Sequence, residues 1–250
     1  MSSAQQAVRP PPWLRDGLPA IPDDLRPSVA TMPQPLASKV SANPGLSFYA
    51  TGGFRERPLL AVAFAAVVEE FAVCETCLAE LYLALRATDP DAAAGDLQEK
   101  INFSQRIDMV RAESSGLPKE QEAIVAAVAD RAQTAARLRN RVVHATWGYA
   151  PALGDAVHAS PTKKLLDELQ QRLRGRLGLP TSYTNAEDGV MVYKASDFAS
   201  IRTVVDEASA ALQLLTNYVL ADNVGAQSML LDMLLSDPQT QRRYEAQLGG

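Results

Sequence analysis

Residues 138–147 place an arginine, an asparagine and a histidine close together at the end of a predicted helix. Arg139 and Asn140 are adjacent, and His144, one of only two histidines in the chain, follows one helical turn later. A guanidinium binds phosphate through a planar fork of donors, an imidazole exchanges a proton near neutral pH, and an amide can orient either group. This combination predicts chemistry on a phosphodiester.

The predicted helix turns most of these side chains away from its apolar stripe. At about 100° per residue, the stripe is centred within residues 138–142, whereas Arg137, Asn140 and His144 lie roughly opposite. Asn140 and His144 are one turn apart, so their side chains can touch. Arg139 flanks the stripe, and we expect it to be partly buried.

This polar face has two interpretations. Arg137, Arg141 and His144 follow the i, i+4, i+7 spacing of one helix face, which favours a surface for a ligand or a second subunit. Alternatively, basic residues in a last turn complement the negative end of the helix dipole, and Asn or His side chains there satisfy free carbonyls. The spacing by itself leaves both interpretations open.

The composition limits where the protein works and what it binds. A net charge of -5 and a pI near 5.2 give no overall positive field, so any phosphate-binding surface must be local. The two cysteines give no disulfide framework, and the first residues lack a basic segment followed by an apolar stretch and a cleavage site, so we expect no secretory leader. Its longest apolar run is about half of the ~20 residues that a membrane span needs. We therefore expect a cytoplasmic protein with no membrane partner.

Apolar residues that recur at alternating intervals of four and three predict long amphipathic helices. The second helix is expected to open at Asp96, with Glu99 completing a capping box. Four such helices predict an all-α fold, a four-helix bundle with an insert between helices three and four. The predicted helices cover residues 58–88, 96–114, 118–144 and 197–222.

The other segments have weaker patterns. Ten of the sixteen prolines fall between Pro10 and Pro58, which predicts an irregular arm outside the core. The insert is expected to hold a short helix at about 162–174 and a small β-hairpin of residues 156–159 and 190–194. The prediction divides the chain into a proline-rich arm (1–57), a helical bundle (58–222) with its insert (about 148–195), and a short helix with a polar tail (223–250).

Arg139-Asn140, three residues and then His144, at the end of a bundle helix and followed by Trp147, resembles the HEPN family. The hallmark of that family is an arginine, a polar residue directly after it, and a histidine four to six residues beyond. The resemblance covers the bundle, about 58–222, and Trp147 is similar to an uncharacterised bacterial branch. Residues 102–107 also look like the second long helix of such domains.

The resemblance implies a metal-independent endoribonuclease without a cofactor, in which two protomers form one cleft that contains both histidines. His144 would take the proton of a ribose 2'-hydroxyl or give one to the leaving 5'-oxygen. Arg139 would stabilise charge on the phosphate, and Asn140 would orient the histidine or bind the phosphate. The implied site comprises catalytic Arg139, Asn140 and His144, with substrate-binding Arg137, Arg141 and Trp147.

The resemblance also bears on partners. It implies a homodimer that acts on RNA, serves as a toxin or defence effector, and is restrained by an antitoxin or a regulatory protein. Many relatives of this fold keep the helices without cleaving RNA. The alternative function is therefore a non-catalytic helical module for dimerisation or regulation, which binds a partner protein through the same face.

Other residues capable of chemistry have simpler interpretations. Cys74 and Cys77 have the spacing of a metal or redox pair, but no second pair exists and Cys74 lies on the apolar seam, so we expect core packing and no metal site. The glutamates of the first helix are expected to form a solvated surface, and Glu70 is the one that we would test for an ion pair with a motif arginine. His158 is expected to be a surface or packing residue.

Overall fold

The computed structural model describes residues 32–49, 51–182 and 188–249. This part of the chain is mostly helical, as the apolar periodicity predicts, and it also contains a small four-stranded sheet. In chain order the elements are β1 (Gln34–Pro35), α2 (Leu36–Ala42), α3 (Gly53–Glu56), α4 (Pro58–Leu85), α5 (Pro90–Glu99), α6 (Phe103–Ser114), α7 (Lys119–Val143), β2 (Ala145–Tyr149), the 3-10 helix Pro151–Leu153, β3 (Val157–Pro161), α8 (Thr162–Arg176), β4 (Met191–Tyr193), α9 (Ala195–Leu220), α10 (Val224–Leu235) and α11 (Pro238–Gly249).

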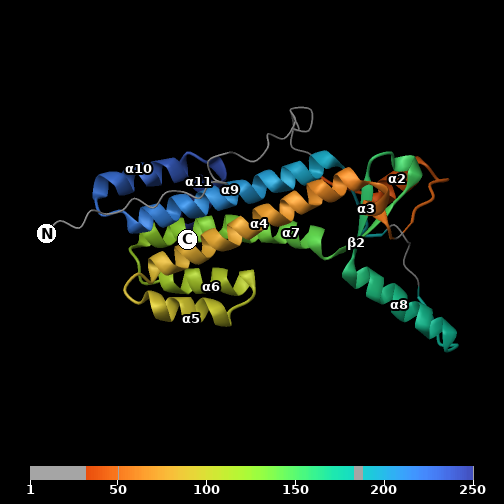
Figure 1. Cartoon of the computed structure of the whole chain (residues 1–250), viewed down its shortest axis with the longest axis horizontal. Coiled ribbons are helices and arrows are strands. Elements are labelled where there is room, and N and C mark those ends of the chain that lie inside the picture. Colours follow the sequence, from red (N-terminus) through yellow and green to blue (C-terminus); the bar gives the residue numbers. More distant parts are fainter. Residues whose placement is uncertain (1–31, 50, 183–187, 250) are drawn as a thin grey trace.

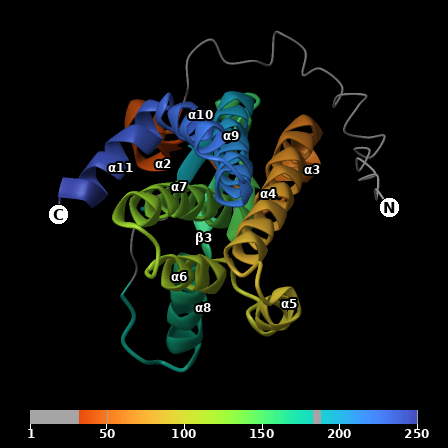
Figure 2. The same cartoon turned by 90° about the vertical axis from the view of Figure 1, so that its left-hand side faces the viewer.

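Helices α4, α7 and α9 run together along the long axis of the molecule (Figure 1). Their buried residues, such as Leu78, Val128 and Leu212, form the main core. Helices α5 and α6 lie on one side of these three, and α10 and α11 lie on another (Figure 2). The predicted seams are thus confirmed, because each long helix buries the apolar positions that recur along it.

The second predicted helix is two helices, and the capping box expected at Asp96 is wrong. Helix α5 begins earlier, because the Asp89 carboxylate accepts a hydrogen bond of 3.2 Å from the backbone N–H of Ala92. The chain then breaks before α6, where the guanidinium of Arg106 donates a 2.8 Å bond to the carbonyl of Lys100. A side chain thus satisfies a carbonyl at the end of α5.

The predicted polar tail is helix α11, which packs on α7. It begins where the carboxylate of Asp237 accepts a 2.6 Å hydrogen bond from the backbone N–H of Thr240. The same carboxylate lies 2.7 Å from the buried guanidinium of Arg131 on α7, which also contacts Glu207 on α9 at 3.2 Å. This ion-paired cluster joins the last helix to the bundle.

The sheet is larger than the predicted hairpin. Its four strands are antiparallel neighbours in the order β1-β4-β3-β2, and β3 and β4 lie where two strands were expected. Strand β2 was not predicted, although it starts within two residues of the end of α7. Ala145 pairs with Pro161, and Ala159 pairs with both Trp147 and Met191.

Part of the proline-rich arm belongs to the core, contrary to the expectation that it stays outside. Leu36 on α2 is completely buried, and Phe54 on α3 packs within 4.9 Å of the Trp147 ring. Tyr49 pairs with Tyr149 through two backbone hydrogen bonds of 2.7 and 3.0 Å. Residues 1–31 of the predicted arm lie outside the described residues.

The sheet separates two small apolar clusters at one end of the bundle. On the bundle side, Trp147 and Tyr193 pack against Phe198 of α9. On the other side, Leu36 packs against Val192 of β4. The sheet is therefore covered on both faces, and it fixes the chain that leaves α7.

Helix α8 projects from this end of the molecule, away from the bundle (Figure 1). It forms where the sequence predicts a short helix, but Leu166, Leu169 and Leu173, which are half or more exposed, leave its apolar side largely uncovered by the described residues. Among the described helices, none combines the length and the apolar character that a membrane crossing requires.

Candidate active site

His144 stands at the junction between α7 and β2. Its backbone N–H donates a 3.1 Å hydrogen bond to the Asn140 carbonyl, and its own carbonyl accepts a short bond from the Thr162 hydroxyl. The pairing of Ala145 with Pro161 brings Thr162, the first residue of α8, to this point. The backbone of His144 is therefore held on both sides, while its side chain is exposed, as the helical spacing predicts.

A cavity of about 380 Å³ opens beside this histidine. Its polar part comes from the last turns of α7, and its apolar part comes from three neighbouring strands. The α7 residues that line it are Asn140, Arg141 and His144, and the strand residues include Ala145, Ala159 and Met191. Side chains that lie far apart in the sequence thus meet at the end of the motif helix.

Arg139 points elsewhere. Its guanidinium carbon lies 5.0 Å from the centre of the Phe71 ring on α4, and Nη1 donates a 3.0 Å hydrogen bond to Oδ1 of Asn140. Nε is buried and has no hydrogen-bond partner among the described residues. Arg139 is half-buried, as expected from its place beside the stripe, and it is not among the residues that line the cavity. Asn140 is the link between Arg139 and the cavity.

The three residues assigned to substrate binding lie in different surroundings. Arg137 and Arg141 are exposed on α7, but only Arg141 lines the cavity. Trp147 is half-buried on β2, where its indole N–H donates a 3.1 Å bond to the Val142 carbonyl. Its ring lies 5.1 Å from that of Tyr193. The indole thus packs between the sheet and the bundle.

Tyr193 and Thr162 were not singled out by the sequence, yet both line the cavity. Burial raises the pKa of the Tyr193 hydroxyl, whereas the nearby charge of Arg141 lowers it. The alternation of β4 places Met191 and Tyr193 on one face, which the sequence does show. It does not show that this face meets the end of α7, because that depends on the pairing of β4 with β3.

The remaining candidates are structural. Glu70 pairs with Arg202 of α9 at 3.3 Å, so the suggested ion pair with a motif arginine is wrong. Cys74 and Cys77 are buried in the main core, which confirms the packing interpretation, and burial raises the pKa of Cys74 to about 12. His158 is buried behind the sheet. Within the described residues, no group of three or more His, Cys, Asp or Glu side chains is placed to hold a metal ion.

No protein-family model, curated protein or solved structure matches the chain. The resemblance to the HEPN family therefore stays a prediction that depends on Arg139, Asn140 and His144. What the structure adds is their surroundings: two of these residues line a cavity together, and the third contacts one of them.

Proposed function

We propose that the protein is a metal-independent endoribonuclease of the HEPN kind, built on a HEPN-like bundle. The observation that supports this proposal is the exposed His144, which lines one cavity together with Asn140 and Arg141. A proton-transfer group, an orienting group and a phosphate-binding group are the parts that cleavage of RNA without a metal requires. All three come from the last turns of a single helix.

In this proposal the imidazole of His144 takes the proton from a ribose 2'-hydroxyl. The 2'-oxygen then forms a bond to the adjacent phosphorus, the bond from phosphorus to the 5'-oxygen breaks, and that oxygen receives a proton from an acid. The products are a 2',3'-cyclic phosphate and a 5'-hydroxyl. Proton transfer by a positioned side chain contributes about 10²- to 10⁴-fold in rate. Because the nucleophile is the 2'-hydroxyl, DNA is not a substrate.

The two arginines have different roles in this proposal. Arg141 is exposed and lines the cavity, so its guanidinium is the one that contacts the phosphate and stabilises the charge that develops there. Arg139 acts through Asn140, whose side-chain oxygen it holds at 3.0 Å. Arg139 is then a positioning residue, and Asn140 orients either the imidazole or the phosphate.

A homodimer supplies the second proton-transfer group. The proposed cleavage needs both an acid and a base. Each chain contributes only one exposed histidine, His144, because His158 is buried. A two-fold interface would bring a second His144 without any further residue. The exposed side of α7 that carries Arg137, Asn140 and His144 is the surface that we propose for this contact.

The test compares RNA cleavage by the wild type with that by His144→Ala, each purified in the same way and assayed with and without a chelator. Arg242→Ala is the matched control, because Arg242 is an exposed cation on α11 at a distance from the site. We expect at least a 100-fold loss for His144→Ala, no loss for the control, and no effect of the chelator. A substrate with a single 2'-deoxyribose should not be cut at that position.

Three results would contradict this function. Cleavage that persists in His144→Ala would come from a contaminant or from other residues, and cleavage that stops with chelator would require a metal. A wild type with no activity on any RNA would favour the non-catalytic module, which binds a partner protein. The proposal extends to a toxin or defence effector, so expression of the wild type, but not of His144→Ala, should arrest growth unless an antitoxin is present.

A further inference from the structure

We propose that the cavity beside His144 holds the base of one nucleotide next to the scissile phosphate, so that cleavage depends on the identity of that base. This inference rests on the proposed function for its substrate, RNA. It assigns residues of strands β2, β3 and β4 to base recognition, separately from the motif residues on α7. The observations that carry it are the chemistry of the cavity walls and the size of the cavity.

The walls divide into two chemical parts. The strands contribute Ala145, Ala159 and Met191, whose side chains offer an apolar surface, while Arg141 and His144 stand at the exposed side. A nucleotide has the matching division, since its base has two flat apolar faces and its phosphate is anionic. Single-stranded RNA is commonly recognised through bases that leave the stack and enter protein pockets.

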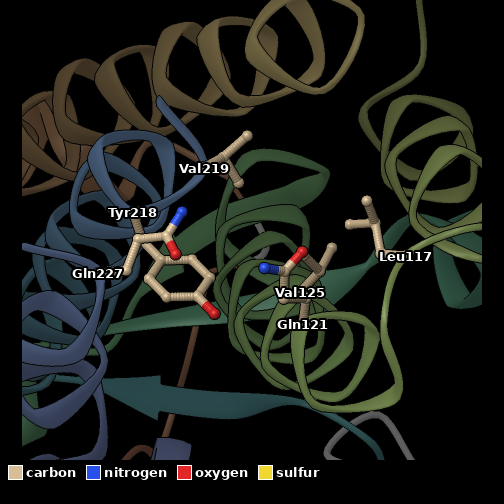
Figure 3. A pocket seen from close by; sticks show the side chains of 6 residues that line it. All are labelled: Leu117, Gln121, Val125, Tyr218, Val219 and Gln227. Carbon is tan, nitrogen blue, oxygen red and sulfur yellow. The ribbon is translucent and has the colours of Figure 1, made fainter. Parts of the chain in front are cut away.

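The volume fits one nucleoside rather than a length of RNA. Small-molecule sites have volumes of about 300–1,000 Å³, and the value of about 380 Å³ lies at the lower end. A second cavity, between α7, α9 and α10, has only about 130 Å³ and is lined by Gln121, Tyr218 and Gln227 among others (Figure 3). It lies roughly 35 Å along α7 from His144, from the rise of about 1.5 Å per residue, and is too small for a base.

Two hydroxyl groups allow the cavity to distinguish bases. Tyr193 is 3% exposed and lines the cavity, and its hydroxyl lies within electrostatic reach of Arg141 at the rim. Burial favours the protonated phenol, which donates a hydrogen bond. Thr162 already donates its hydroxyl proton to the His144 carbonyl, so its oxygen is free to accept. A donor and an acceptor on the wall favour the base whose edge presents an acceptor and a donor at the matching positions, because any other base leaves one of these groups unpaired.

The experiment titrates the purified protein with adenosine, cytidine, guanosine and uridine 3'-phosphates, and with inorganic phosphate, by calorimetry. We expect one of the four nucleotides to bind at least 10-fold more tightly than the weakest of them and than phosphate. Ala145→Phe should fill the cavity and remove this advantage. Ala92→Phe, at an exposed position on α5, should leave it unchanged.

A second variant tests the same cavity without introducing a large side chain, as Ala145→Phe does. Tyr193→Phe removes a single oxygen, and we expect it to reduce the difference between nucleotides several-fold while phosphate binding stays the same. Thermal unfolding of each variant shows that it is folded. Equal affinity for all four nucleotides and for phosphate, or full selectivity in both Ala145→Phe and Tyr193→Phe, would overturn the inference.

The experiments distinguish an error in the proposed base-binding cavity from an error in the proposed ribonuclease activity. If RNA is cut in a His144-dependent manner, but at every base alike and equally by Ala145→Phe, the cavity does not bind a base and the ribonuclease stands. If the nucleotides bind selectively and the wild type cuts no RNA, the cavity stands as a nucleotide site and the catalytic proposal fails.

Discussion

Arg139 and Asn140, neighbours on α7, are joined by a 3.0 Å hydrogen bond from Nη1 to Oδ1, and only the second of them lines the cavity. The same guanidinium lies 5.0 Å over the ring of Phe71 on α4. One arginine therefore connects the end of the motif helix to α4 and holds the amide of Asn140, which lines the cavity together with His144. Of the three residues assigned to catalysis, Asn140 and His144 line the cavity, whereas Arg139 contacts Asn140 and does not line it.

This arrangement predicts that Arg139→Ala lowers both stability and activity. The loss of the contact with Phe71 and of the hydrogen bond should reduce the free energy of unfolding by about 1–2 kcal/mol. Urea unfolding measures this change. Under the proposed function, the kcat for RNA cleavage should fall while KM changes little, because Arg141 is the residue that we propose to contact the phosphate. Arg137→Ala, two residues earlier and exposed, should change the free energy of unfolding by less than about 0.5 kcal/mol.

Arg139→Lys separates the charge from the geometry. A lysine keeps the positive charge but lacks the planar fork, so we expect it to recover part of the stability and little of the kcat. The idea of a positioning role would be wrong if Arg139→Ala raised KM as much as Arg141→Ala does and left kcat unchanged.

The long helices and the exposure of His144 were predictable because they depend on local periodicity. The alternation of four and three along α4 and α9 fixes which faces are buried. The same rule places Asn140 and His144 one turn apart on the side opposite the stripe. These properties need no knowledge of the partners that cover the stripe.

The surroundings of the site were not predictable because they depend on pairing between distant segments. Strand β2 follows α7 so closely that the helical pattern hid it, and its role becomes visible only through its pairing with β3. Tyr193 reaches the end of α7 by way of β4, some fifty residues later in the chain. Leu36 and Phe54 were missed because proline-rich composition conceals short packed segments.

The close contacts around Gly148 predict that any larger residue at this position destabilises the protein. A Cβ there would overlap the Tyr49 carbonyl oxygen and the His158 ring, since the backbone of Tyr49 pairs with the neighbouring Tyr149 of β2. Gly148→Ala should therefore lower the free energy of unfolding by about 1–3 kcal/mol. Gly95→Ala on α5, where nothing lies within 4 Å, should raise it by about 0.5–1 kcal/mol. Equal effects of the two substitutions in chemical denaturation would refute this close packing around Gly148.

The burial of His158 predicts that the protein loses stability at mildly acidic pH. Burial lowers its pKa below the ordinary value of 6.5, and the backbone groups of Tyr49 and Tyr149 counteract this only in part. The unfolded chain therefore binds a proton that the folded chain does not, so stability is fully present above pH 6.5 and is lost as the pH falls toward the folded pKa.

The measurement is urea unfolding between pH 7.5 and 5.5 on the wild type and on His158→Gln, which cannot titrate. The decrease in stability with falling pH should be smaller in His158→Gln, whatever its stability at neutral pH. His144→Ala, which removes the exposed histidine, should keep the decrease seen in the wild type. If His144→Ala removed it instead, the pH dependence would belong to the site.

The ion pair between Arg131 and Asp237 is predicted to hold the last helix, α11, against the bundle. The Arg131 side chain is 7% exposed and lies 2.7 Å from Asp237 and 3.2 Å from Glu207. Asp237→Ala leaves a largely buried guanidinium with one carboxylate fewer and also removes the hydrogen bond that begins α11, so the free energy of unfolding should fall by about 2–4 kcal/mol.

Hydrogen exchange locates this effect. In Asp237→Ala the amides of α11 should exchange faster, while those in the middle of α4 keep their protection, because α11 packs on α7 and not on the centre of α4. Asp232→Ala, a carboxylate one turn earlier on α10, is the matched control and should leave α11 protected. The pKa of Asp237 is lowered, because its hydrogen bonds to Thr240 and the charge of Arg131 outweigh the effect of burial, so this stabilisation should persist down to about pH 4 and disappear below it.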